Sequence, residues 1–299
     1  LAIDALFENA KLINQHADAD FIYSDEDKID TQGRRSDPFF KPEWSPDYFH
    51  ACMYTCHLGV YRTRLIRQIG GFRPGYDGSQ DYDLVLRVVE ATQNIYHIPK
   101  ILYHWRIVPS SVTAGAQAKP WAYAAAKRAL ANMLARSPYP GWVEETDRAG
   151  FWRVRRQILG QPLVSIVIPS AGKVIHTPKG PLSVLENCIR SIQQHSTYPN
   201  LEIVLVDGYD IPEAMLERLG ERSSESSLPP IRLVRCAEPF NFAQRINLGA
   251  DAANGEFLLF LNDDTEIVTP DWIESMLEFA QQSEIGAVGA KLLYPDHTV

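Results

Sequence analysis

Mostly apolar runs in the second half of the chain predict strands that alternate with amphipathic helices. The runs lie at 163–168, 201–206, 231–234 and 257–261. Between them, apolar residues recur at helical spacing over 182–194, 213–222 and 242–253. The last run, 257–261, has no polar alternation, so we expect a strand that is buried on both faces. Strands alternating with helices favour βαβ units and an α/β fold with a mostly parallel sheet and flanking helices.

The pattern in the first half is less regular. Residues 1–13 are expected to form a helix whose apolar stripe faces the core, namely Ile3, Leu6, Phe7, Ala10 and Ile13. Further helices are expected over 62–69, directly after 80–83, and over 119–134. Short strands are expected at 19–23, at 57–61 and within 94–105. Residues 34–47, which are rich in proline and aromatic side chains, are expected to form an extended loop.

The two ends of the chain show a similar order of elements. A helix is expected after 269–272 and a strand over 286–293, as in the opening segment, with Asp271 opposite Asp4. A unit repeated at both ends predicts two partial copies of one domain in tandem. Chance likeness of two short αβ units is the alternative. The expected divisions are the back half of a first domain at 1–135, a linker at 136–161 and the front half of a second domain at 162–299.

Composition narrows the class of protein. The hydrophobic fraction of 45% is that of a globular protein, and the net charge of −8 does not favour nucleic-acid binding. Four scattered cysteines fit no disulfide framework and indicate a reducing compartment, so a cytoplasmic location is expected. No apolar run is long enough to span a bilayer, which leaves peripheral docking at the inner face of the plasma membrane open. Because the chain opens on Leu1 and stops after a turn-like stretch at 294–297, we expect a fragment of a longer protein.

Polar and acidic residues follow the last apolar run directly. Asn262, Asp263 and Asp264 stand at its carboxyl end, where open α/β sheets bind their ligands. Two adjacent carboxylates repel each other unless a positive charge is shared, and a hard divalent cation that carries substrate phosphates would supply it. The alternative is an acidic turn that caps the next helix.

An ordered set of motifs resembles a known family. The second half carries PLVSIVIP at 162–169, LVD at 205–207 and FLNDDT at 260–265, and is similar to the donor half of a family-2 glycosyltransferase. The first half resembles the acceptor half, with GGF at 70–72, QDYD at 80–83, YHWR at 103–106 and SSVTA at 110–114. The likeness covers nearly the whole chain. It is strongest with bacterial tandem-domain enzymes of cell-surface polysaccharide and O-antigen synthesis.

The resemblance implies a GT-A-like, Rossmann-like nucleotide-diphospho-sugar transferase fold. It implies transfer, with inversion, from a nucleotide-diphosphate sugar donor to a glycan or lipid-linked glycan acceptor. It also implies a divalent Mg²⁺ or Mn²⁺, with Asp264 as the firmest ligand and Asp263 or Asn262 assisting at the donor diphosphate. The other residues implied in donor binding are Ser170, Asp207 and Asn247. For Asp207, the local signal fits a helix N-cap equally well.

By the same resemblance, Asp81 is the candidate catalytic base, because an inverting transfer needs a carboxylate that takes the proton of the acceptor hydroxyl. Asp83 would orient it; the alternative is a helix N-cap with a first-turn acid. His104 is a further candidate metal ligand, with a structural histidine beside Trp105 as the alternative. The base and the metal-binding strand would belong to different tandem domains. This chain alone is therefore expected to have little or no transferase activity.

The sequence departs from the family pattern in two places. The family often places an arginine directly before the asparagine of its donor helix, whereas Ile246 stands there and Arg245 lies one residue earlier. A contact between Arg245 and the donor is therefore open. The loop at 171–180 is long and lacks the donor-contacting acid that is usual there.

Several other patterns are given structural interpretations. The acidic run 25–27 is expected to be solvated rather than metal-binding. Cys52, Cys56 and His57 lack the second pair that a zinc site needs. The chain contains neither a GxGxxG nor a GxxxxGK[ST] pattern, which argues against a dinucleotide enzyme and a phosphate loop. The expected strand at 163–168 is not followed by the Gly-rich loop that a nucleotidyltransferase needs. The functional alternative that stays open is a non-catalytic nucleotide- or glycan-binding module.

Overall fold

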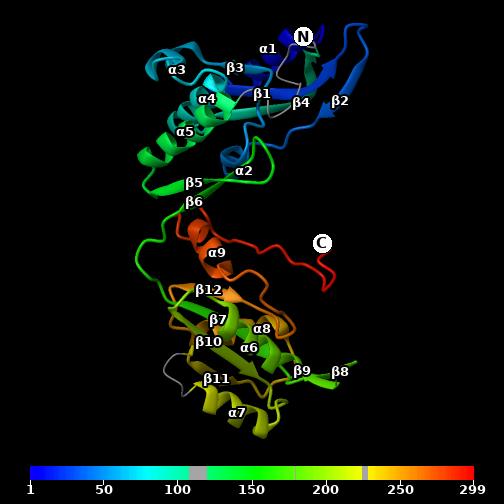
Figure 1. Ribbon diagram of the computed structural model, residues 1–299, viewed down its shortest axis with the longest axis vertical. Coiled ribbons are helices and arrows are strands. Elements are labelled where there is room, and N and C mark those ends of the chain that lie inside the picture. Colours follow the sequence, from blue (N-terminus) through cyan, green and yellow to red (C-terminus); the bar gives the residue numbers. More distant parts are fainter. Residues whose placement is uncertain (108–119, 179, 224–227) are drawn as a thin grey trace. The chain divides into compact units, whose positions relative to one another are not determined.

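The computed structural model describes residues 1–107, 120–178, 180–223 and 228–299. The chain divides into two compact units, Leu1–Gln157 and Ile158–Val299 (Figure 1). The predicted motif at 110–114 and the polar residues 224–227 lie outside the described residues. No described helix combines the length and apolar character needed to cross a membrane.

The second unit is built on a four-stranded parallel sheet, as the sequence predicts for this half. Its strands are β7 (Val164–Ser170), β10 (Leu201–Asp207), β11 (Ile231–Arg235) and β12 (Phe257–Phe260). They lie in the order β11-β10-β7-β12, and all three neighbouring pairs are parallel. All seven residues of β7 and of β10 are buried, because these two strands occupy the centre of the sheet.

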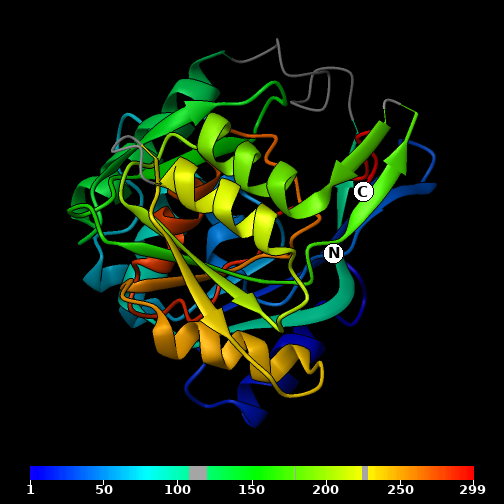
Figure 2. The same ribbon diagram turned by 90° about the horizontal axis from the view of Figure 1, so that it is seen from below.

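Helices cover both faces of this sheet. They are α6 (Val184–His195), α7 (Glu213–Ser223), α8 (Phe242–Ala252) and α9 (Trp272–Ala280). Apolar side chains of α6, α7 and α9 pack with Ile166 and Ile203 on one face, whereas those of α8 pack with Val167 and Val204 on the other. Figure 2 shows α6 and α7 together on one side of the strands and α8 on the opposite side. A short hairpin, β8 (Val174–Thr177) with β9 (Gly180–Ser183), occupies the predicted long loop.

The prediction that β12 is buried on both faces is wrong. Leu258 and Phe260 are 45% and 55% exposed, and burial alternates along the strand. The reason is position, since β12 is an edge strand that pairs only with β7 in the described sheet. The strand predicted at 286–293 is also wrong, because those residues are irregular.

The first unit has a mixed sheet, unlike the parallel sheet of the second unit. Its strands are β1 (Phe21–Ile29), β2 (Arg35–Phe39), β3 (Gly59–Tyr61) and β4 (Ile95–Arg106). The central strand β1 pairs in parallel with β4 and antiparallel with β2 and β3. Strand β2 forms inside the stretch predicted as a loop, where its backbone pairs with the end of β1.

Helices of the first unit are α1 (Ala5–Gln15), α2 (Pro46–Ala51), α3 (Thr63–Gln68), α4 (Gln80–Ala91) and α5 (Pro120–Arg136). Side chains of α4 and α5 pack with Phe21 and Tyr23 of β1 in the main core. The prediction that the apolar stripe of α1 faces the core is wrong. Its buried residues are Ala5 and Asn9, whereas Leu6 is 77% exposed. Small Ala5 allows the helix to approach Ile98 and Leu102 of β4 closely.

Most of the stretch expected as a linker is folded structure. Residues of β5 (Gly141–Glu145) pair antiparallel with β6 (Trp152–Arg156). Val143, Trp152 and Val154 of this hairpin are buried in the core of the first unit together with residues of α5. The division between the two units falls after Gln157.

Candidate functional site

The carboxyl ends of β7 and β12 bring together two residues predicted for donor binding. The hydroxyl of Ser170, the last residue of β7, donates a hydrogen bond to Oδ2 of Asp263 at 2.5 Å. It also accepts the backbone N–H of Gly172 at 3.0 Å. Because β7 and β12 are parallel neighbours, their carboxyl ends share one edge of the sheet. Open α/β sheets bind their ligands at this edge.

The acids after β12 differ in exposure. Asp263 is half-buried beside Ser170, whereas Asn262 and Asp264 are exposed. Burial, with the charges of Asp263 and Asp264 adding to it, raises the pKa of the nearby Cys188 thiol to about 12. Within the described residues, no three or more His, Cys, Asp or Glu side chains are grouped so as to hold a metal ion.

Asp207, at the end of β10, is fully buried and its carboxylate is engaged on both sides. Oδ1 accepts the backbone N–H of Asp210 at 3.0 Å and of Ile211 at 3.1 Å. Oδ2 accepts Nη1 of Arg235, at the end of β11. Asp207 is not a helix N-cap, since α7 begins at Glu213. Its predicted contact with the base or ribose of a donor stays a prediction, and would require one of these bonds to open.

Arg245, near the start of α8, is a residue whose role the sequence left open. Its side chain is 3% exposed. Nε and Nη1 find no hydrogen-bond partner among the described residues, and Nη2 lies 3.5 Å from Oδ2 of Asp210. The guanidinium lies against Gly208, where a β-carbon would come within 2.0 Å of Nη2. The ring of Phe240 covers it, with the ring centroid 4.8 Å from Cζ.

Asn247, also predicted for donor binding, lies elsewhere on α8. It is exposed and stands two residues after Arg245. A helix turns by about 100° per residue, so the two side chains point to nearly opposite sides of α8. The structure therefore does not group Asn247 with Arg245, and its donor contact stays a prediction.

In the first unit, Asp81 and Asp83 lie in the first turn of α4 but have different surroundings. Asp83 is buried and accepts hydrogen bonds from Arg73 and Arg87. Burial alone would raise the pKa of Asp83, but the bonds from the two arginines hold it below its usual value. Asp81 is only half-buried. Burial chiefly raises the pKa of the Cys56 thiol to about 12, and the charge of Asp81 adds to that rise.

The expectation that the acidic run 25–27 is solvated is wrong. Asp25, Glu26 and Asp27 are all buried within β1, and each carboxylate has a basic partner. Asp25 Oδ1 lies 2.8 Å from Nε2 of His97, and Glu26 Oε2 lies 3.3 Å from Nζ of Lys41. Burial raises the pKa of Glu26, but a hydrogen bond from His57 and the charge of Lys41 outweigh it and lower that pKa.

Asp27 places the candidate ligand His104. Oδ1 of Asp27 lies 2.5 Å from Nδ1 of His104, and Oδ2 accepts Nε of Arg35 at 2.5 Å. The carboxylate therefore fixes one ring nitrogen of His104 and leaves Nε2 as the nitrogen available for a ligand. His104 belongs to the first unit, whereas Asp263 and Asp264 belong to the second. A metal site confined to one unit cannot contain all three.

Comparison with known proteins identifies the second unit. A family model described as Glycosyl transferase family 2 matches residues 165–298, which is nearly the whole of that unit. Residues 165–298 are thus similar to glycosyl transferase family 2, and the second unit is called the family 2 unit from here on. The match, together with the similarity to an O-antigen biosynthesis protein, confirms the predicted resemblance to a family-2 glycosyltransferase of bacterial polysaccharide synthesis.

Two curated relatives match the chain over both units. The uncharacterized protein y4gI of Sinorhizobium fredii (strain NBRC 101917 / NGR234) is 40% identical over 98% of this chain and 32% of its own length. The O-antigen biosynthesis protein RfbC of Myxococcus xanthus is 38% identical over 100% of this chain and 22% of its own. The chain thus spans a third or less of these relatives.

A solved structure with partial likeness is the mannosyltransferase PcManGT from Pyrobaculum calidifontis in complex with GDP-Man and Mn²⁺. It is 18% identical, has a TM-score of 0.39, and is matched over 56% of this chain and 42% of its own.

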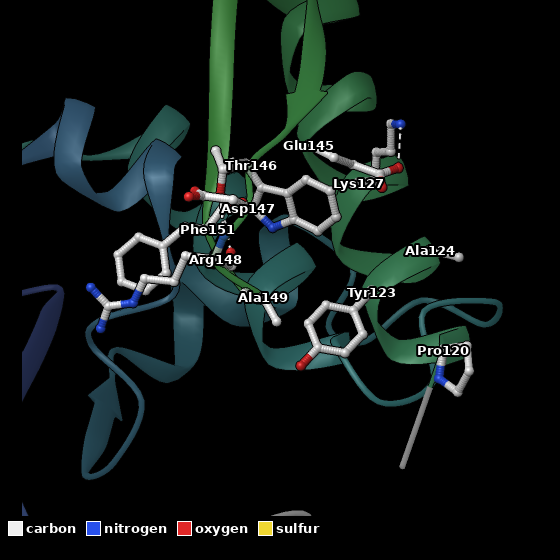
Figure 3. A pocket seen from close by; sticks show the side chains of 12 residues that line it. Pro120, Tyr123, Ala124, Lys127, Glu145, Thr146, Asp147, Arg148, Ala149 and Phe151 are labelled. Carbon is white, nitrogen blue, oxygen red and sulfur yellow. Dashed lines mark hydrogen bonds and ion pairs between the residues drawn. The ribbon is translucent and has the colours of Figure 1, made fainter. Parts of the chain in front are cut away.

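The first unit contains a cavity lined by residues within 120–152. It has a volume of about 510 Å³ and lies between α5 and the turn joining β5 to β6. Figure 3 shows Tyr123, Ala149 and Phe151 around it, with Lys127 and Glu145 forming an ion pair at one side. None of the residues predicted for catalysis, metal or donor binding lines this cavity.

Proposed function

We propose that the chain takes part in the transfer of a sugar, with inversion, from a nucleotide-diphosphate donor to a glycan or lipid-linked glycan acceptor in bacterial surface polysaccharide synthesis. The observation that carries the proposal is the contact of Ser170 with Asp263 at the carboxyl edge of a family 2 sheet. This contact holds a carboxylate where a donor diphosphate and its cation would meet the protein. The four free cysteines agree with a reducing, cytoplasmic location.

The residues after β12 fit a bound Mg²⁺ or Mn²⁺. Asp263 is held by Ser170, Asp264 is exposed, and both offer the hard oxygen ligands that such cations prefer. Two carboxylates without a third protein ligand suit a cation that takes its remaining ligands from substrate phosphates and water. When bound, the metal would neutralise the charge that develops on the departing nucleoside diphosphate.

In this proposal the protein groups have separate tasks. Ser170 holds the Asp263 carboxylate through Oδ2, and Oδ1 would be the oxygen offered to the metal. Asp264 binds at the exposed side of the turn. Asp207 and Arg235 keep the adjacent end of β10 rigid, which fixes the wall against which the nucleotide would lie.

On the acceptor side, Asp81 is proposed as the general base. Its half-buried carboxylate at the first turn of α4 would take the proton of an acceptor hydroxyl as that oxygen forms the new glycosidic bond and a nucleoside diphosphate leaves. The donor for that step would be bound by the tandem domain that contains Asp81, not by the second unit. Asp83 would act indirectly, because its bonds to Arg73 and Arg87 anchor the turn that carries Asp81. His104, oriented by Asp27, is proposed to offer Nε2 to a metal of its own tandem domain, which is a different metal from the one at Asp263 and Asp264.

Titration calorimetry of the whole chain tests the donor side. UDP, GDP, ADP, CDP and their common sugar derivatives would be titrated with and without Mn²⁺. The proposal expects binding that depends on Mn²⁺ and is lost in Asp264→Ala but kept in Asp251→Ala, an exposed acid of α8. Metal-independent binding, or equal binding by both variants, would overturn the metal assignment. A family 2 unit that binds none of these nucleotides would overturn the proposed function.

A glycan-binding module is the second candidate, and the cavity of Figure 3 favours it. Tyr123 and Trp152 line the cavity with aromatic rings. The charged side chains that line it are two of each sign, namely Lys127 and Arg148 with Glu145 and Asp147, so their charges cancel. A neutral, amphipathic sugar fits such a lining better than a phosphate does. Oligosaccharide binding that needs no metal or nucleotide, and that is lost in Tyr123→Ala, would favour this candidate.

A further inference from the structure

Two buried N–H donors of Arg245 have no hydrogen-bond acceptor in the described part of the chain. Nε and Nη1 are enclosed without a hydrogen bond. A buried donor without an acceptor costs about 1–3 kcal/mol, and more when it belongs to a charged group. The side chain also sits near the N-terminal end of α8, where the helix dipole disfavours a cation.

The charges around Arg245 show what kind of acceptor is missing. Nη2 faces Asp210 at 3.5 Å, and neighbouring Arg235 is paired with Asp207. Each guanidinium therefore already has a carboxylate. The unmet need is for neutral acceptor oxygens, such as carbonyl groups, rather than for a further anion.

Two exposed aromatic rings stand beside these arginines. Phe240, 69% exposed, lies over the Arg245 guanidinium, and Tyr209, 63% exposed, lies over that of Arg235. A mostly exposed ring is held by little packing, so Phe240 can turn aside and open Nε and Nη1 to a ligand. Flat heteroaromatic rings stack well on such side chains.

The separation between Asp263 and Gly208, which lies beside the Arg245 guanidinium, fits a bound nucleotide. Gly208 follows β10 and Asp263 follows β12, and these two strands flank β7. Two strand spacings separate them by about 10 Å. A ribose and one phosphate bridge a distance of this order between a base and a metal-bound phosphate.

We propose that Arg245 reads the nucleobase of the donor and selects a base with a carbonyl group at the position it faces. Arginine has donors only and accepts nothing. It pairs with the 6-carbonyl of guanine or the 4-carbonyl of uracil, and opposes the amino group that adenine and cytosine carry there. The inference rests on the proposed function, since it identifies the nucleotide of the same donor. It assigns base recognition to Arg245 in place of the fully engaged Asp207.

Matched nucleotide pairs test the proposal on the whole chain. The dissociation constants of GDP and ADP, and of UDP and CDP, would be measured with Mn²⁺ for the wild type and for Arg245→Gln. The wild type is expected to bind the carbonyl member of the preferred pair about tenfold or more tightly, which is the value of one charge-assisted hydrogen bond. Arg245→Gln is expected to weaken that member to the level of its partner. Arg232→Gln, which removes a half-exposed arginine at the start of β11, is expected to leave the preference unchanged.

Gly208→Ala is a second test of whether the Arg245 guanidinium sets the base preference. Its β-carbon would occupy the place of Nη2 and displace the guanidinium without removing its charge. It is expected to abolish the preference as Arg245→Gln does. Thermal melting of Arg245→Met separates binding from structure. The variant loses a 3.5 Å contact with the half-exposed Asp210, which is worth little, and removes two buried unpaired donors, so the melting temperature should stay equal or rise. A lower melting temperature, or a carbonyl preference that persists in both variants, overturns the inference. Failure of all nucleotides to bind the wild type overturns the proposed function instead.

Discussion

Ser170 and Asp263 lie 93 positions apart in the chain, yet the Ser170 hydroxyl donates to Oδ2 of Asp263 at 2.5 Å. The bond joins the end of a central strand to the turn after an edge strand. It is the contact through which the fold of the family 2 unit sets the direction of a candidate ligand.

Ser170→Ala should therefore weaken binding of Mn²⁺ with nucleotide without unfolding the protein. Loss of a hydrogen bond to a carboxylate costs about 1.5–3 kcal/mol, so the dissociation constant should rise about tenfold or more. Calorimetric titration measures it. Ser275→Ala is a matched control, because it removes another serine–aspartate bond, at 3.2 Å to Asp271, in α9. An equal effect of both variants would show that the Ser170 bond has no special role.

Asp207→Asn tests whether the Asp207 carboxylate stabilises the fold or binds the nucleotide-sugar donor. The fully buried Asp207 is bonded to Arg235 and to two backbone N–H groups, so the amide variant should destabilise the end of β10 by about 2 kcal/mol. Hydrogen exchange of the peptide covering 201–211 should become faster. Unchanged exchange with a large loss of nucleotide binding would instead place Asp207 in the donor site.

Much of the second unit could be predicted from the sequence because its signals are local. The apolar runs at 163–168 and 201–206 became the buried strands β7 and β10, and the residues after the strands met at one edge. The run at 257–261 looks the same but forms an edge strand with Phe260 exposed. Apolar content does not distinguish a central strand from an edge strand, since that depends on which strands pair.

The parts that could not be predicted depend on partners distant in the sequence. Asp25 is buried because His97, 72 positions away, meets it on the neighbouring strand. Without that partner, an acidic run is indistinguishable from a solvated one. Arg245 likewise carries no local signal of burial, because Gly208 and Phe240 enclose it only after β10 and α8 have packed together.

Asp83 should make the stability of the first unit depend on pH in the acid range. Its pKa is lower in the folded protein than the value of about 3.9 in an unfolded chain, so the folded state binds fewer protons there. The stabilisation is complete above that unfolded value and is lost as the pH falls below it. Asp83→Asn should be less stable by about 3 kcal/mol at pH 7, because Arg73 and Arg87 lose their partner.

Urea unfolding at pH 7, 4 and 3 checks this expectation. The wild type and Asp83→Asn should differ most at pH 7 and approach each other at pH 3. Asp77→Asn, which changes an exposed acid of the preceding loop, should follow the wild type at every pH. A constant difference between wild type and Asp83→Asn across the series would mean that the ionised carboxylate contributes nothing.

Two helix glycines of the second unit should respond in opposite ways to the same substitution. A β-carbon at Gly249 of α8 would come within 2.3 Å of Cγ1 of Val167 and 2.9 Å of Cγ2 of Val206, so Gly249→Ala should push α8 away from the sheet. Overpacking of this kind costs about 1–3 kcal/mol. A β-carbon at Gly220 of α7 meets no atom of the described residues within 4 Å, so Gly220→Ala should stabilise by up to about 1 kcal/mol through helix propensity. Hydrogen exchange over β7 and α8 should become faster in Gly249→Ala, and exchange over α7 should become slower in Gly220→Ala.

If Gly249→Ala were neutral, the close approach of α8 to β7 and β10 would not be a feature of the folded protein, and the placement of Arg245 beside Gly208 would lose its support.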